Sequence, residues 1–169
     1  MSEINIRGFD SSFTTEDEVI PLMRAKGITI VDYNPEVSKI VNMSKREIET
    51  LTLDTCATAV LQIGQHLIYL DNLYSVYNFI HTKLKTQFDR LSASFEKDEK
   101  RGKNVGEKRA FVYEDYPELE KLSEMVDNSK LEMELLRDKN KTMLEFLNTL
   151  KRKLDQLQFE YNNQYRTLS

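Results

Sequence analysis

Two stretches of this chain repeat an apolar side chain at alternating intervals of three and four residues. Thirteen consecutive positions follow the repeat over residues 53–95 with one polar member, and thirteen follow it over residues 119–161 with two. This spacing places every member on one stripe of an α-helix, which is typical of a coiled-coil seam. We therefore predict two long helices, over about residues 53–98 and 116–163.

The residues between the two repeats are mostly charged and contain Gly102 and Gly106, so we expect a solvated, basic turn within about residues 99–115. Two heptad helices with a short connection pack antiparallel. The predicted fold class is therefore all-α, a long antiparallel coiled-coil helical hairpin. Centring the turn near residue 107 places His81 opposite Met133 and Ser129, which predicts a core histidine bonded to the Ser129 hydroxyl or to a carbonyl rather than a ligand-binding one.

The composition excludes several other classes of fold. Only 5 Gly and 3 Pro are present, whereas a β-sandwich or barrel needs many turns built from these residues. A single Cys excludes an intramolecular disulfide framework, and one Cys with two His makes a zinc site a poor expectation. Long helices remain as the architecture that this composition favours.

Residues 1–43 differ from the rest, because they hold four of the eight Gly and Pro residues. Residues 28–33 alternate in the manner of a short strand, but no second strand is predicted to pair with it. We expect a mixed N-terminal arm that is loosely structured or ordered by a partner or by the chain's own helices. Ser44 and Glu47 then have the spacing of a capping box at the start of a short helix. The helical hairpin region is predicted to occupy residues 44–169.

Apolar side chains also lie outside the two seams, so the hairpin has more apolar surface than two helices bury. We predict that this surface joins copies of the chain in a homo-oligomer. In the alternative interpretation, the N-terminal arm covers it. The predicted interface residues are Leu61, Ile68, Leu73, Ile80, Leu144 and Phe146.

No catalytic pattern is present. The sequence contains no Gly-rich phosphate loop, no H-E-x-x-H and no G-x-S-x-G, and Cys56 falls in the seam without a base. We expect a protein that is not an enzyme and uses no cofactor or metal. The longest apolar-leaning run, residues 55–70, is too short to span a bilayer, and the N-terminus has no apolar signal segment. These features predict a cytoplasmic protein, in the host cytoplasm if the chain is phage-encoded.

Basic and aromatic residues gather around the predicted turn. The net charge is −4, but residues 81–109 carry nine basic and five acidic side chains. Basic groups neutralise phosphates and flat rings stack on bases, so this mixture suits single-stranded nucleic acid. In the alternative interpretation, the basic groups solubilise a turn and the rings close the end of the hairpin. The candidate residues are Lys97, Lys100, Arg101, Lys103, Lys108, Arg109, Phe111, Tyr113 and Tyr116.

Five segments of the chain carry a resemblance to a known family. They are Ile40–Cys56, Leu67–Leu70 with Tyr74 and Asn78, Glu107–Ala110, Glu118–Leu122 and Met143–Leu150. In this order the segments resemble the phage UvsY-like recombination mediators and related small phage helical proteins. The resemblance implies an oligomeric protein that binds single-stranded DNA and helps a recombinase to load by displacing or rearranging single-strand-binding protein, in DNA recombination and repair. It also implies DNA contact by a basic segment, here Lys108 and Arg109.

Two functions from different classes therefore remain open. The first is a single-stranded DNA-binding accessory protein of recombination, in which several weak basic tips of an oligomer act on one strand. The second is a non-enzymatic coiled-coil structural, adaptor or host-inhibitor protein of a phage. Salt-dependent retention on single-stranded DNA separates them.

Overall fold

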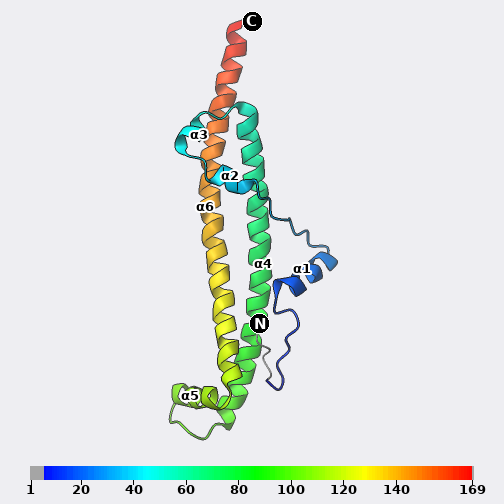
Figure 1. Cartoon of the computed structure of the whole chain (residues 1–169), viewed down its shortest axis with the longest axis vertical. Helices are drawn as coiled ribbons and strands as arrows, with labels where there is room; N and C mark the ends of the chain where they lie inside the picture. The colour runs from blue at the N-terminus through cyan, green and yellow to red at the C-terminus, as the bar shows by residue number, and fades with distance from the viewer. Residues whose placement is uncertain (1–5, 169) are drawn as a thin grey trace. The chain divides into compact units, whose positions relative to one another are not determined.

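The structure is a computed structural model that describes residues 6–168, with side chains described as far as residue 164. Over that range the regular secondary structure is all helical, as predicted, with no strand (Figure 1). The first five residues of the predicted arm lie outside the described range. The helices are α1 (Glu16–Ala25), α2 (Val37–Val41), α3 (Lys45–Glu49), α4 (Leu53–Asp98), α5 (Val105–Asp115) and α6 (Pro117–Leu168).

The two predicted long helices are confirmed as α4 and α6, which pack together. The chain divides into two compact units, and each contains part of both helices. The first unit combines the described residues up to Thr29 with Tyr74–Leu135, and the second combines Ile30–Leu73 with the described residues from Leu136 onward.

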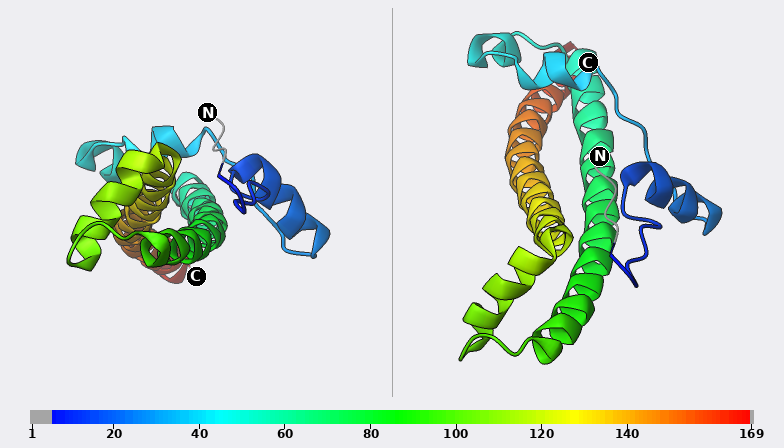
Figure 2. Two further views of the ribbon diagram at one scale, coloured as in Figure 1. Left: turned by 90° about the horizontal axis from the view of Figure 1, so that it is seen from below. Right: turned by 60° about the horizontal axis from the view of Figure 1, so that its bottom comes forward.

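In the first unit, seam positions of α4 and α6 meet in one buried cluster that includes Leu84 and Leu122. Helix α1 packs on the side of α4 that faces away from α6 (Figure 2). Its Val19 is fully buried with Ile80, and its Met23 packs against the same cluster. Ile80, which was predicted to lie in an oligomer interface, is therefore buried within the single chain, where α1 covers it.

In the second unit, α2 covers α4 in a similar way. Val37 and Ile40 share a buried cluster with Ile63 of α4 and with residues of α6. The Cys56 thiol donates to the Leu150 carbonyl at 3.5 Å. The Asn140 amide of α6 also donates to Asp71 of α4, and these two contacts show that the helices run antiparallel in this unit.

The capping box before α3 is confirmed. The Glu47 amide donates to the Ser44 hydroxyl at 3.3 Å, and the Ser44 amide donates to the Glu47 carboxylate at 2.6 Å. Two backbone donors at the helix start are thereby satisfied. The hydrogen bonds to Glu47 also hold the pKa of that carboxyl below its usual value.

Residues 28–33, which alternate in the manner of a short strand, have an irregular backbone instead. The backbone amide of Ile28, the first residue of this segment, hydrogen-bonds to the last turn of α1. Gly27 adopts a left-handed conformation with φ +79°, its amide donates to Arg24, and the Ile28 amide donates to Met23. This is a Schellman ending, and it leaves a connection rather than a strand that needs a partner.

Of the predicted turn over residues 99–115, only residues 99–104 lie outside a helix. Helix α5 fills the rest, because the Asn104 side chain accepts from the Glu107 amide at 2.9 Å and caps a new helix. Gly102, with φ +83°, reverses the chain before this cap. Helix α5 ends at Asp115 because a residue before a proline avoids the helical region, and Tyr116 adopts φ −133° and ψ 73°.

Candidate nucleic-acid interface

All nine candidate nucleic-acid-binding residues belong to the first unit. They lie on the last turn of α4, on the loop after it, on α5, and at the junction with α6. The structure therefore gathers them around one bend of the chain. It does not make them equally available to a ligand, since the two arginines and the three aromatic rings already contact other side chains.

Arg101 is held by two carboxylates and a ring. Its guanidinium pairs with Glu99 at 2.8 Å and with Asp115, and it lies 4.7 Å from the centre of the Phe111 ring. The hydrogen bond to Glu99 raises the pKa of Arg101 and lowers the pKa of Glu99 to about 2. This arginine joins the loop to the C-terminal half of α5 and neutralises acidic charge inside the chain.

Arg109 is also engaged. Its Nε atom lies 2.6 Å from a carboxylate oxygen of Glu96, and its guanidinium lies 6.0 Å from the centre of the Phe88 ring. Burial opposes ionisation of Glu96, but hydrogen bonds from Ser92 and Arg109 hold its pKa below the usual value. Arg109 thus ties α5 to α4.

The lysines of the candidate set behave differently. Within residues 6–168, no carboxylate lies within ion-pair distance of Lys97, Lys100, Lys103 or Lys108. The first three are exposed, and Lys108 is half-buried. The ammonium groups available to an external anion are therefore those of the lysines near the α4 end.

The three aromatic rings also differ in how much of their surface is exposed. Tyr116 stacks on Phe95 with ring centres 4.4 Å apart, yet it keeps 44% of its surface exposed. Tyr113 is half-buried against the core of the first unit, and Phe111 lies beneath Arg101. Tyr113 closes the helical end as the alternative interpretation predicted, whereas Tyr116 presents a ring to solvent.

The local charge is balanced over the bend as a whole. Residues 96–116 contain six basic and six acidic side chains, a net charge of zero. The unpaired lysines nevertheless lie in the segment 97–103, which has four basic and two acidic side chains, a net charge of +2. Any attraction for phosphate therefore comes from that segment rather than from the entire bend.

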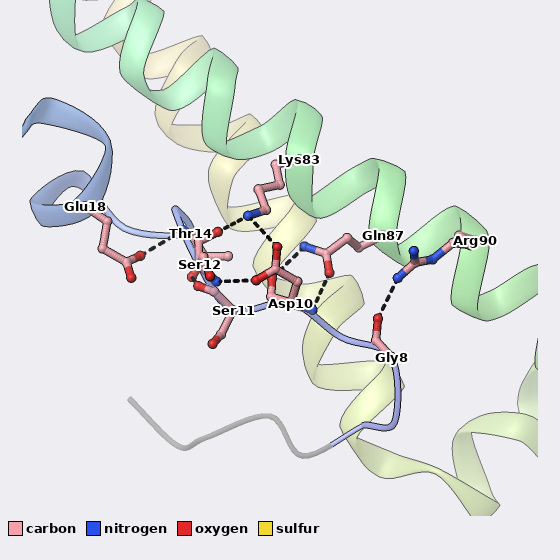
Figure 3. Close-up of polar contacts among 9 residues, drawn as sticks. All are labelled: Gly8, Asp10, Ser11, Ser12, Thr14, Glu18, Lys83, Gln87 and Arg90. Atoms are coloured by element: carbon pink, nitrogen blue, oxygen red, sulfur yellow. Dashed lines mark hydrogen bonds and ion pairs between the residues drawn. The ribbon is translucent and has the colours of Figure 1, made fainter. Parts of the chain in front are cut away.

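A further polar row on α4 was missed by the sequence analysis. Lys83, Gln87 and Arg90 recur at intervals of four and three residues, which places them on one face of the helix. Residues 8–14, here called the strap, lie across this face (Figure 3). The spacing was visible in the sequence, but the heptad seam on a neighbouring face was the stronger periodic signal.

The predicted oligomer residues have unequal exposure. Leu61, Ile68 and Leu144 keep 62%, 52% and 49% of their surface exposed. Leu73 and Phe146 are half-buried, and Phe146 packs against the core of the second unit. The free apolar surface of the second unit is therefore smaller than predicted.

Cys56 is buried, and burial raises the pKa of its thiol, which makes it a poor nucleophile. Over residues 6–168, no three His, Cys, Asp or Glu side chains gather in a way that holds a metal ion. No helix in that range combines the length and apolar character needed to cross a bilayer.

No protein-family model, curated protein or solved structure matches this chain.

Proposed function

We propose that this protein is a non-enzymatic helical accessory protein that binds single-stranded DNA through the segment from Lys97 to Tyr116. The observation that carries the proposal is the set of exposed lysines at the end of α4, none of which has an ion-pair partner in residues 6–168. The Tyr116 ring, which stacks on Phe95 of the same helix, keeps 44% of its surface exposed. Ammonium groups and exposed rings are the two elements of sequence-independent single-strand binding.

The roles of the candidate residues follow from their partners. Lys97, Lys100 and Lys103 neutralise phosphates, and Tyr116 stacks on a base. Arg101 and Arg109 shape the site through their carboxylate pairs and are not its main phosphate contacts. Three phosphate contacts on a single strand predict a slope of log affinity against log salt of roughly −2, from about −0.7 per contact.

We further propose that the protein acts in recombination and repair, as a mediator that helps a recombinase to load where single-strand-binding protein is present. The support is the resemblance of its helical segments to the UvsY-like mediators. A site with three phosphate contacts is weak alone, so the proposal includes a homo-oligomer in which linked sites act on one strand. The long antiparallel helices then form coiled-coil hairpins, and the exposed Leu61, Ile68 and Leu144 join the copies.

A second candidate is a structural or adaptor protein that binds another protein. The balanced charge of residues 96–116 and the exposed apolar residues of the second unit favour it. Under this proposal, Leu61, Ile68 and Leu144 contact a protein partner, and the lysines of the bend serve solubility.

The deciding experiment is fluorescence anisotropy of a labelled oligothymidylate, titrated with the full chain between ~50 and ~200 mM salt, where phosphate binders weaken steeply. One variant replaces Lys97, Lys100 and Lys103 by Gln. Its matched control replaces Lys121, Lys139 and Lys141, three exposed lysines of α6, and loses the same charge.

Binding that weakens with salt, and that the first variant loses while the control keeps it, supports the DNA proposal. Equal loss in both variants points to overall charge and overturns the assignment of the site. Absence of binding by the wild-type chain at ~50 mM salt overturns the DNA function and leaves the adaptor function.

A further inference from the structure

The face of α4 beneath the strap presents donors in a row. The ammonium of Lys83, the amide of Gln87 and the guanidinium of Arg90 succeed one another along the helix (Figure 3). Lys83 and Arg90 are seven residues apart, ~10 Å along the axis. Lys97 follows Arg90 after another seven residues on the same face, and it is exposed. The row therefore leads directly into the proposed DNA-binding segment.

The strap occupies this row almost entirely with oxygen acceptors. Lys83 donates to the Asp10 carboxylate at 3.0 Å and to the Ser12 carbonyl. The Gln87 amide donates to the Asp10 carbonyl at 2.8 Å, and Arg90 donates to the Gly8 carbonyl. One contact runs in the other direction, since the Asp10 amide donates to the Gln87 side chain at 2.6 Å.

This arrangement matches what a phosphodiester backbone offers. A carboxylate and three carbonyl oxygens face two cationic groups and an amide, and phosphate oxygens bind the same donors. The strap leaves only 20% of the Lys83 side chain exposed, and Gln87 is buried. The Asp10 carboxylate thus occupies the position on Lys83 at which an external anion would bind.

We propose that Lys83, Gln87 and Arg90 form a second phosphodiester-binding surface that continues the Lys97–Tyr116 segment, and that the strap is its internal competitor. This inference rests on the proposed DNA binding. Single-stranded DNA that reaches the row displaces the strap, with Asp10 giving up its place on Lys83 to a phosphate. The closed strap lowers affinity, and its release lengthens the contact with the strand.

The energetics of the strap permit this exchange. The Asp10 side chain keeps 61% of its surface exposed, so solvent reaches the carboxylate and screens its attraction to the more buried Lys83 ammonium. Phe13 has φ +57°, a left-handed conformation that costs a bulky residue ~1 kcal/mol. Ile6 and Phe9 hold the strap by packing in the first-unit core, so the strap stays closed without ligand.

The test is a pair of charge-matched variants of the full chain, assayed with the same labelled oligothymidylate. Asp10→Asn removes the competing charge. Asp17→Asn is the control, because it removes the same charge from an exposed carboxylate of α1. We expect Asp10→Asn to raise affinity several-fold and to steepen the salt slope by about one phosphate contact, and we expect Asp17→Asn to do neither.

Arg90→Gln supplies the second arm of the test. It should abolish the gain that Asp10→Asn produces, because the row then lacks one of its two cationic groups. Amide exchange of residues 8–14 should also accelerate when the oligothymidylate is added. If Asp10→Asn and Asp17→Asn bind with equal affinity, the strap is not a competitor of DNA, and the proposed function still stands. Absence of binding by the wild type and by Asp10→Asn overturns both.

Discussion

The Nδ1 atom of His81 lies 3.0 Å from the hydroxyl oxygen of Ser129. That hydroxyl donates to the Val126 carbonyl at 2.7 Å, so its oxygen is left to accept. Nδ1 must therefore carry the proton of the His81 ring in this contact, and the carbonyl of Val126, 3.2 Å away, is its second acceptor. A polar pair thus joins α4 to α6 inside the first unit.

Removing the Ser129 hydroxyl tests how much this pair contributes to the free energy of unfolding. Ser129→Ala should lower the free energy of unfolding by ~1 kcal/mol, because the half-buried Nδ1 donor of His81 loses the nearer of its two acceptors. Ser123→Ala is the control, a half-buried position on the same helix that gains the same helix propensity. Urea unfolding followed by circular dichroism measures both. Equal midpoints in the two variants would show that the pair adds nothing to stability.

The pairing of His81 with Ser129 was predictable because the heptad register alone aligns the two helices. The start of α4, its end and the capping box at Ser44 were predictable for a related reason, since each depends on residues close in sequence. The face covered by α1 was not predictable. Burial of Ile80 by Val19 depends on where a distant segment packs, and the apolar pattern of α4 accommodates either an arm or a second copy.

The candidate site was predictable in residue type but not in availability. The sequence placed Arg101 and Arg109 beside several carboxylates and offered no means of choosing which pairs form. The pairs depend on α5, a helix that the two glycines and dense charge of the turn obscured. The polar row on α4 was missed because its importance comes from Asp10, more than seventy residues away in the chain.

Freeing Arg109 should strengthen DNA binding if the proposed site is correct. Glu96→Gln removes the carboxylate that holds this guanidinium, so we expect a steeper salt slope, by about −0.7 for one added phosphate contact. Asp98→Asn makes the same charge change at an exposed neighbour on α4 and is the control. The measurement is oligothymidylate anisotropy against salt. The same slope in both variants would mean that Arg109 does not reach the strand.

Assembly should depend on the exposed apolar residues of the second unit. Light scattering of the wild type at micromolar concentration should give at least a dimer mass. Leu61→Glu with Leu144→Glu should lower that mass and leave helicity largely intact, because both side chains are exposed in the single chain and charge opposes their burial between copies. Leu131→Glu, at an exposed leucine of the first unit, should leave the mass unchanged. A monomeric wild type would refute the oligomer.

Backbone strain introduced at Gly8 should loosen the strap, and Gly27 provides the matched control. Gly8 and Gly27 have φ +91° and +79°, and an added Cβ meets nothing closer than 3.7 Å at either position. Substitution by Ala should cost ~1 kcal/mol at each. Only Gly8→Ala should speed amide exchange at Asp10, because Gly8 lies in the strap and Gly27 ends α1. Equal exchange at Asp10 in both variants would show that the strap is held independently of Gly8.

The last prediction concerns His66 of the second unit. This ring is buried, its centre lies 5.5 Å from that of Tyr69 and 5.8 Å from that of Tyr33, and no residue in the range 6–168 bonds its buried Nδ1 atom. Burial lowers the pKa of His66 below its ordinary 6.5. The folded chain therefore binds fewer protons here than the unfolded chain, so its stability falls as the pH drops below about 6.5. We expect the urea midpoint to fall between pH ~7.5 and ~5.5 at constant protein concentration, and His66→Phe to flatten this dependence while keeping a ring against the tyrosines. A midpoint that falls equally in the variant would assign the pH dependence to other groups.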